Sequence, residues 1–172
     1  MLNPQQLPQF QPRPALGRLA AALAILSLAP AYGQTPPGGV RWMAALAPDT
    51  PAKAGGTVTI QLDGAIDEGW HVYGLKQLPG GPTPLRVKLD DSDTAVTAGA
   101  ATESTPTTIH DARFGVDTQF HTGTVTVQLP VQLQAGVTGQ RQIPVSVRFQ
   151  LCSEHECQSP RTTHLAVAVE VP

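Results

Sequence analysis

Short runs in which apolar and polar residues alternate recur along most of this sequence, and they limit the folds open to it. A period of two is typical of a β-strand with one buried face. The longest run covers residues 122–133, and Pro130 interrupts it, which predicts an edge position or a bulge there. Its inward positions are Val125, Val127, Leu129, Val131 and Leu133.

The remaining runs are separated by turn signals rich in Gly and Pro, which recur about every 8–12 residues. They give about eight or nine short strands, with no convincing helix and no internal repeat. Residues 102–120 are expected to form one long, irregular segment. We predict an all-β fold, an immunoglobulin-like antiparallel β-sandwich, with a small barrel as the alternative. The runs are residues 40–47, 57–62, 70–73, 85–89, 95–101, 143–151 and 163–171.

The 172 residues are enough for one domain with a substantial core. Only 14% of them are charged and the formal net charge is -2, so no surface suited to nucleic acid is expected.

The N-terminal segment has the composition of an export signal. Arg13 and Arg18 precede an apolar, Ala-rich run at residues 19–29, and Ala31 and Gly33 are small residues suited to a cleavage site. These three parts together are typical of a secretory signal peptide, and the run is short for a membrane span. We expect cleavage after Gly33 or Ala31; an uncleaved membrane anchor is the alternative.

These boundaries predict a signal peptide at residues 1–33, a linker at 34–39 and a β-sandwich domain at 40–172. The exported protein is expected in the periplasm, without stable membrane insertion after signal cleavage. Disulfide bonds form in such a compartment.

The two cysteines of the sequence, Cys152 and Cys157, lie at the end of one alternating run. If the strand continues without a bulge, Cys152 falls on the face of Arg148 and Gln150, opposite the inward valines. That parity predicts an accessible sulfur at the strand end, because a purely structural cysteine is expected among the core residues.

The residues alone leave three roles open for the cysteine pair. A structural disulfide across so short a loop would stabilise the fold by only about 2 kcal/mol. A redox disulfide could be attacked by another protein's thiolate, with His155 favouring a thiolate and Glu154 and Glu156 opposing it. A metal site could combine both cysteines with His155, and His164 could be a fourth ligand; thiolate plus imidazole would suit copper or zinc. The spacing matches no standard zinc pattern.

Three segments, in the same order, resemble the N-terminal (alpha) domain of the thiol:disulfide interchange protein DsbD. Residues 149–160, FQLCSEHECQSP, resemble the active-site segment of that family. Residues 66–84, IDEGWHVYGLKQLPGGPTP, look like its aromatic strand and Gly-Gly-Pro loop. Residues 109–127, IHDARFGVDTQFHTGTVTV, look like the segment that bears its cap loop.

The resemblance implies an immunoglobulin-like sandwich in which Cys152 and Cys157 form a redox-active disulfide. Phe114 matches the aromatic ring of the family's cap loop, and Asp111 matches an acidic cap residue. His71 and Tyr73 fall where family aromatics approach the active site; the alternative is that they are ordinary strand residues. Phe120 and Trp70 are expected in the core. No cofactor and no metal are expected.

The resemblance also implies partners. Such a domain receives electrons from the thioredoxin-like domain of a membrane electron transporter and passes them to oxidised periplasmic thiol-disulfide proteins, including cytochrome c maturation thioredoxins. The implied activity is protein-disulfide reduction within thiol:disulfide interchange, and the family implies Cys157 as the attacking cysteine. Because the membrane and thioredoxin domains of the full transporter are missing from this sequence, we expect separately encoded partners, or a paralogue with another task. The rival functions are a non-catalytic periplasmic binding module with a structural disulfide, and a copper-binding domain that uses Cys152, His155 and Cys157.

Overall fold

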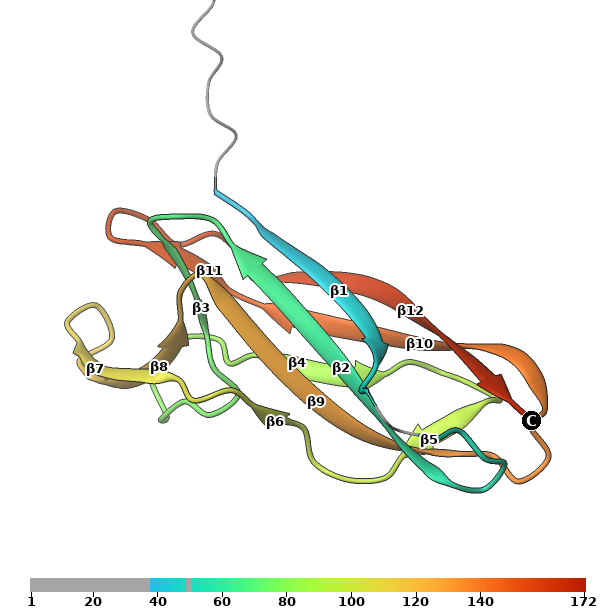
Figure 1. Cartoon of the computed structure of the whole chain (residues 1–172). Helices are drawn as coiled ribbons and strands as arrows, with labels where there is room; N and C mark the ends of the chain where they lie inside the picture. The colour runs from blue at the N-terminus through green and yellow to red at the C-terminus, as the bar shows by residue number, and fades with distance from the viewer. Residues whose placement is uncertain (1–37, 49–50) are drawn as a thin grey trace, which may run out of the picture. The chain divides into compact units, whose positions relative to one another are not determined.

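The computed structural model describes residues 38–48 and 51–172. The expected signal peptide and residues 34–37 of the expected linker lie outside the described residues. Within them the chain forms twelve β-strands and no helix (Figure 1). The strands are β1 (Val40–Leu46), β2 (Thr57–Ile66), β3 (Trp70–Tyr73), β4 (Arg86–Leu89), β5 (Ala95–Thr97), β6 (Thr102–Glu103), β7 (Thr107–Asp111), β8 (Val116–His121), β9 (Thr124–Leu133), β10 (Gly139–Phe149), β11 (Leu151–Ser153) and β12 (Arg161–Val171).

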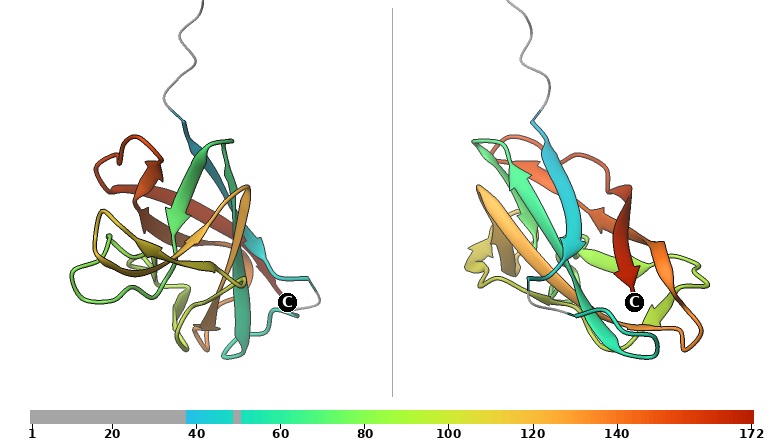
Figure 2. Two further views of the ribbon diagram at one scale, coloured as in Figure 1. Left: turned by 90° about the vertical axis from the view of Figure 1, so that its left-hand side faces the viewer. Right: turned by 45° about the vertical axis from the view of Figure 1, so that its right-hand side comes forward.

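The strands form three antiparallel sheets. The first sheet has the order β1-β2-β9-β5, with β6 also paired to β9, and the second has the order β12-β10-β4. The third, which we call the site sheet, has the order β11-β3-β8-β7. Figures 1 and 2 show the first two sheets as layers, with the site sheet at one end. The predicted fold class, an immunoglobulin-like antiparallel β-sandwich, is confirmed.

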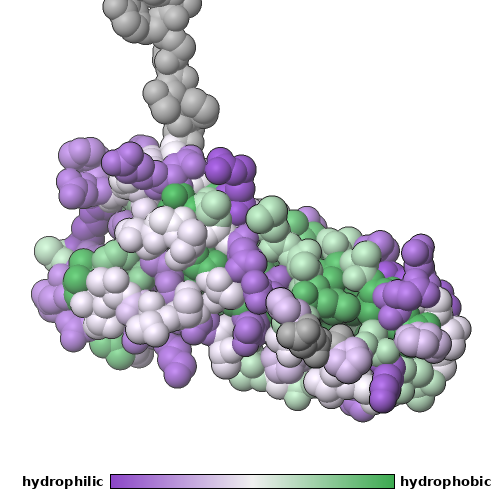
Figure 3. All heavy atoms as spheres, in the orientation of Figure 1, coloured by the Kyte–Doolittle hydropathy of each residue, from purple (hydrophilic) through white to green (hydrophobic). Residues whose placement is uncertain are grey.

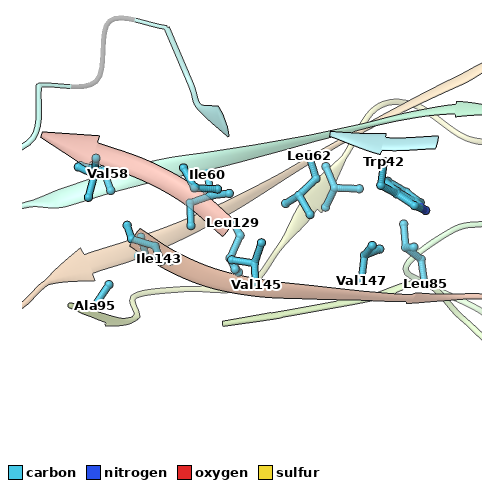
Figure 4. Packing of buried hydrophobic residues seen from close by; sticks show 14 of the residues in the cluster. Trp42, Val58, Ile60, Leu62, Leu85, Ala95, Leu129, Ile143, Val145 and Val147 are labelled. Atoms are coloured by element: carbon cyan, nitrogen blue, oxygen red, sulfur yellow. The ribbon is translucent and has the colours of Figure 1, made fainter. Parts of the chain in front are cut away.

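The core lies between the first and second sheets (Figure 4). The burial of β2 and β9 alternates residue by residue, as the sequence pattern predicts. On β10 the residues Ile143, Val145, Val147 and Phe149 are all buried. The ring of Trp42 on β1 packs against Phe149 with centroids 5.8 Å apart, which joins the two layers near the site sheet. Burial of these large apolar side chains is the main stabilising contribution of the fold.

For the middle of the chain, the expected irregular segment was wrong, and so was the edge position, the first of the two alternatives at Pro130. Residues 102–120 are not irregular, because β7 and β8 form a regular hairpin within them. β9 is not an edge strand, since β2 pairs with one side of it and β5 and β6 with the other. The carbonyl of Pro130 accepts the N–H of Ala98 in the gap between β5 and β6. The proline, which has no N–H to donate, therefore faces an interruption in the neighbouring strands.

β10 and β11 form a continuous path from the second sheet to the site sheet, with Gln150 between them. The side-chain carbonyl of Gln150 accepts the N–H of Thr83 at 2.9 Å, which ties this switch point to the loop after β3. Because β10 is fixed in the core, the position of β11 and of Cys152 is set by the same packing.

Gly64 on β2 gives a test of this packing. A Cβ atom there would lie 2.9 Å from Cζ3 of Trp42 and 2.9 Å from Cγ1 of Val125, both buried. We expect Gly64→Ala to lower the free energy of unfolding by about 1–3 kcal/mol, because overpacking forces neighbouring side chains to move. Urea denaturation measures this. Gly136→Ala is the control, since nothing lies within 4 Å of that Cβ; equal stability of the two variants would contradict the packing.

Candidate functional site

The two cysteines form a disulfide across a tight hairpin turn. Cys152 on β11 and Cys157 face each other as an isolated antiparallel bridge, with their Cα atoms 4.1 Å apart. The N–H of Ser153 donates to the carbonyl of Glu156 at 2.8 Å, and the N–H of Gln158 donates to the carbonyl of Leu151 at 2.9 Å. These flanking bonds make the cysteines a non-hydrogen-bonded pair, in which facing side chains lie closest together.

The turn between the cysteines is held by one hydroxyl group. Oγ of Ser153 accepts the N–H groups of His155 and Glu156, both at 3.2 Å. Glu154, His155 and Glu156 are all exposed. The sequence placed His155 between the cysteines, and the structure places it at the tip of this polar turn.

The two halves of the disulfide differ in exposure. Cys152 is 0% exposed, whereas Cys157 is an exposed residue. The expectation of an accessible sulfur at Cys152 was wrong, because the strand switches sheets at Gln150 and β11 is buried on both faces. Cys152 lies between His71 of β3 and Cys157, so its own face is covered as well. The exposed cysteine of the pair is Cys157.

His71 and Tyr73 lie on the same face of the site sheet as Cys152, because paired residues of antiparallel strands share a face. The His71 ring packs edge-on against Tyr73 at 5.0 Å and lies 5.1 Å from the Phe120 ring. Phe120, expected in the core, therefore lies half-buried in the site sheet. Trp70, also expected in the core, is partly buried and packs against the edge of the core cluster.

Burial determines the protonation of this aromatic group. Desolvation lowers the pKa of His71, outweighing the opposite effect of the Asp111 charge, and Arg113 lowers it further. The imidazole is therefore neutral at neutral pH. Burial and the neighbouring Asp111 raise the pKa of Tyr73, so its phenol stays protonated and can donate.

The last residue of β7 and the loop that leads to β8, together residues 111–115, are called the cap loop, which is organised around Asp111. Oδ2 of Asp111 accepts the Tyr73 hydroxyl at 3.2 Å, and Oδ1 accepts the N–H of Arg113 at 2.9 Å. The Asp111 carbonyl accepts the N–H of Gly115, whose φ of 67° suits a glycine. The Phe114 ring packs edge-on against Tyr73 at 6.0 Å. The structure thus gathers Asp111, Phe114, Tyr73 and His71 beside the disulfide.

Arg113 is the cap-loop residue that sequence reasoning missed. Its Nη1 donates to Sγ of Cys157 at 3.2 Å, and its Nη2 donates to the carbonyl of Glu154. The guanidinium thus joins the cap loop to the cysteine hairpin. The sequence signal that could have indicated Arg113 was its position beside Phe114. However, the cap loop and the cysteine hairpin lie about forty residues apart in the sequence, and the β3–β8 and β3–β11 pairings bring them together.

The residues of the suggested metal set do not converge. His164 on β12 hydrogen-bonds to Asp90 at 3.0 Å. The pKa of Asp90 is lowered, chiefly by the hydrogen bond from Ser146 and also by His164. Within residues 38–48 and 51–172, no group of three or more His, Cys, Asp or Glu side chains is arranged to hold a metal ion. The same residues include no helix that is long and apolar enough to cross a membrane.

An open groove of about 770 Å³ lies beside the cysteine hairpin. Its lining includes Trp70, His71 and Tyr73 of β3, Arg113 of the cap loop, and Glu154 of the turn. In Figure 3, strongly hydrophilic residues cover the β2–β3 turn and the β11–β12 loop. The lining of the groove therefore combines aromatic rings with charged side chains.

A family model described as "Thiol:disulfide interchange protein DsbD, N-terminal" matches residues 43–168. The chain belongs to the DsbD N-terminal family. The match includes the cap loop, both cysteines and the aromatic strand β3. A search of curated proteins gave no significant match.

Several solved structures are similar to this chain. The DsbD N-terminal domain of Neisseria meningitidis in its reduced form is 20% identical, with a TM-score of 0.49, over 76% of this chain and 85% of that one. The complex of the DsbD and PilB N-terminal domains from the same organism matches with 18% identity and a TM-score of 0.42, over 73% of this chain and 80% of that one. The N-terminal periplasmic domain of ScsB from Proteus mirabilis is 17% identical, with a TM-score of 0.43, over 77% of this chain and 46% of that one.

Asp111 gives the test of the cap loop. We expect Asp111→Ala to speed reduction of the disulfide by dithiothreitol several-fold, because the loop loses its bonds to Tyr73 and to the N–H of Arg113. Asp117→Ala is the matched control, since Asp117 pairs with His110 in an exposed ion pair of the same hairpin, and such pairs contribute little. Stopped-flow or quenched reduction measures both rates. Equal rates for the two variants would show that Asp111 does not hold the loop over the disulfide.

Proposed function

We propose that this domain is an exported thiol:disulfide interchange protein that relays reducing equivalents. It takes them from a membrane-linked, thioredoxin-like partner and passes them to oxidised periplasmic proteins. The observation that carries the proposal is the divided exposure of the disulfide, with Cys157 accessible and Cys152 buried. Membership of the DsbD N-terminal family and the groove beside the hairpin support it.

The divided exposure selects Cys157 as the cysteine that partners attack. A partner thiolate attacks Sγ of Cys157, the Cys152–Cys157 bond breaks, and Cys152 leaves as a thiolate. A second partner thiolate then attacks the partner sulfur of this mixed disulfide, which releases Cys157 and leaves the partner oxidised by two electrons. The reduced pair repeats the steps in reverse on a substrate: Cys157 attacks a substrate disulfide and Cys152 resolves the mixed disulfide. Solvent takes up and supplies the protons.

The groove is the proposed docking surface for both partners. A partner that inserts its reactive cysteine over Cys157 would cover the aromatic rings of β3 and meet the charged residues of the cap loop and the turn. The DsbD N-terminal domain of Neisseria meningitidis, a homologue, forms a complex with a PilB N-terminal domain. We propose that a thioredoxin-like domain docks here in the same capacity, in the periplasm.

The relay is tested by the reduction potential of the pair and by trapping. We expect a potential of roughly −180 to −270 mV in glutathione or dithiothreitol buffers, the range of thiol–disulfide oxidoreductases. Cys152→Ser should trap a mixed disulfide through Cys157 with a resolving-cysteine variant of a thioredoxin-like domain, whereas Cys157→Ser should trap little. A potential below about −300 mV would instead mark a structural disulfide in a binding module.

Phe114 is proposed as the ring that gates the site by moving with the cap loop. Because its ring packs on Tyr73, its loss should free the loop and expose the disulfide. We expect Phe114→Ala to raise the rate of reaction with small thiols several-fold, and Phe114→Leu, which keeps apolar bulk, to raise it less. Rates are measured with dithiothreitol under pseudo-first-order conditions. An unchanged rate for Phe114→Ala would remove the gating role.

A further inference from the structure

The guanidinium of Arg113 contacts the cysteine pair, and the relay described above gives it no role. It stands at the tip of the cap loop, with Nη1 at 3.2 Å from Sγ of Cys157. Its other terminal nitrogen binds the carbonyl of Glu154 in the turn between the cysteines. Its own backbone N–H is fixed by Asp111, which Tyr73 holds in turn. This chain of contacts directs a permanent positive charge at the accessible sulfur of the pair.

In the disulfide state this contact joins a cation to a neutral sulfur, and it is weak. After reduction the same donor faces a thiol that can lose its proton, and a charge-assisted hydrogen bond to a thiolate is much stronger. Cationic neighbours lower the pKa of cysteine thiols for this reason. Cys152 has the opposite surroundings, because its complete burial disfavours a charge.

The other titratable groups around Cys157 do not supply such a charge. The imidazole of His71 is kept neutral by its burial, and the phenol of Tyr73 is occupied in donating to Asp111. The Asp111 carboxylate accepts bonds from Tyr73 and from the backbone of Arg113. The turn residues are exposed, as Arg113 is, but among the described residues it is Arg113 whose side chain donates to Sγ of Cys157. The turn residues are Glu154, His155 and Glu156.

We propose that Arg113 is a catalytic residue of the exchange, which binds the thiolate of Cys157 in the reduced protein and so makes Cys157 the sulfur that reacts. The inference rests on the proposed relay for its use in the cell. The contact also makes the cap loop responsive to the redox state, because the loop is attached more firmly to the reduced pair than to the disulfide. A docking partner then has to displace Arg113 from the thiolate before the new sulfur–sulfur bond forms.

The decisive measurement is the pH dependence of alkylation of Cys157 by iodoacetamide in a Cys152→Ser background. We expect Arg113→Gln to raise the midpoint of this profile by about one pH unit, because the neutral amide no longer favours the thiolate. Arg113→Lys should leave the midpoint close to that of the parent, since it keeps the positive charge. Arg141→Gln is the matched control: Arg141 also binds a backbone carbonyl, that of Thr138, but on the β10 end of the second sheet. Its profile should equal that of the parent.

A second readout uses the intact cysteine pair, so it does not depend on the folding of the Cys152→Ser background. At a fixed ratio of reduced to oxidised dithiothreitol, Arg113→Gln should lower the equilibrium constant for reduction by up to about tenfold, matching one unit of thiol pKa. If the midpoint of the alkylation profile is unchanged and only the plateau rate rises, Arg113 is a steric cover and the inference is overturned. That result would leave the relay standing, whereas failure of wild-type protein to exchange with any thioredoxin-like domain would remove the relay and leave the alkylation profile intact.

Discussion

The site depends on the packing of one strand. β10, the middle strand of the second sheet, is fixed by the buried side chains of Ile143, Val145, Val147 and Phe149, and the chain then passes through Gln150 into β11. β10 thus contributes to the core, and β11 carries Cys152. A shift of β10 by one residue would exchange its buried and outward faces, so the core excludes other registers. The position of the reactive pair is therefore as precise as the packing of the sandwich itself.

In the site sheet, the two cysteines of the disulfide have different surroundings. β3 and the hairpin of β7 and β8 place aromatic rings and Asp111 on the face where Cys152 lies, and Cys157 is left at the rim. A buried sulfur is a poor target and an exposed one a good target, whatever the intrinsic chemistry of the bond. In the proposed exchange, burial therefore selects the sulfur that reacts, and Arg113 adds a positive charge on the exposed side of the pair.

The alternating runs were sufficient to predict the sandwich and its inward residues, because a period of two reports directly which face of a strand is buried. The motifs likewise identified Cys152, Cys157 and the cap segment. What sequence reasoning missed depends on pairing between distant strands. The burial of Cys152 follows from the sheet switch at Gln150, and the half-exposed position of Phe120 follows from the β7–β8 hairpin. The contact of Arg113 with Cys157 joins residues 44 apart in the sequence, which no local pattern reports.

The tight hairpin also explains how such a pair could change redox state without disturbing the fold. The cysteines are neighbours across a bridge whose flanking backbone bonds, from Ser153 to Glu156 and from Gln158 to Leu151, do not involve sulfur. None of these backbone bonds nor the Ser153 turn depends on the sulfur–sulfur bond, and the apolar cluster packed between the first two sheets includes neither cysteine. The closed loop is so short that its chain-entropy contribution is small, about 2 kcal/mol. A disulfide between distant strands would tie redox state to stability; this one confines the change to a turn, its cap loop and the charge that Arg113 holds beside it.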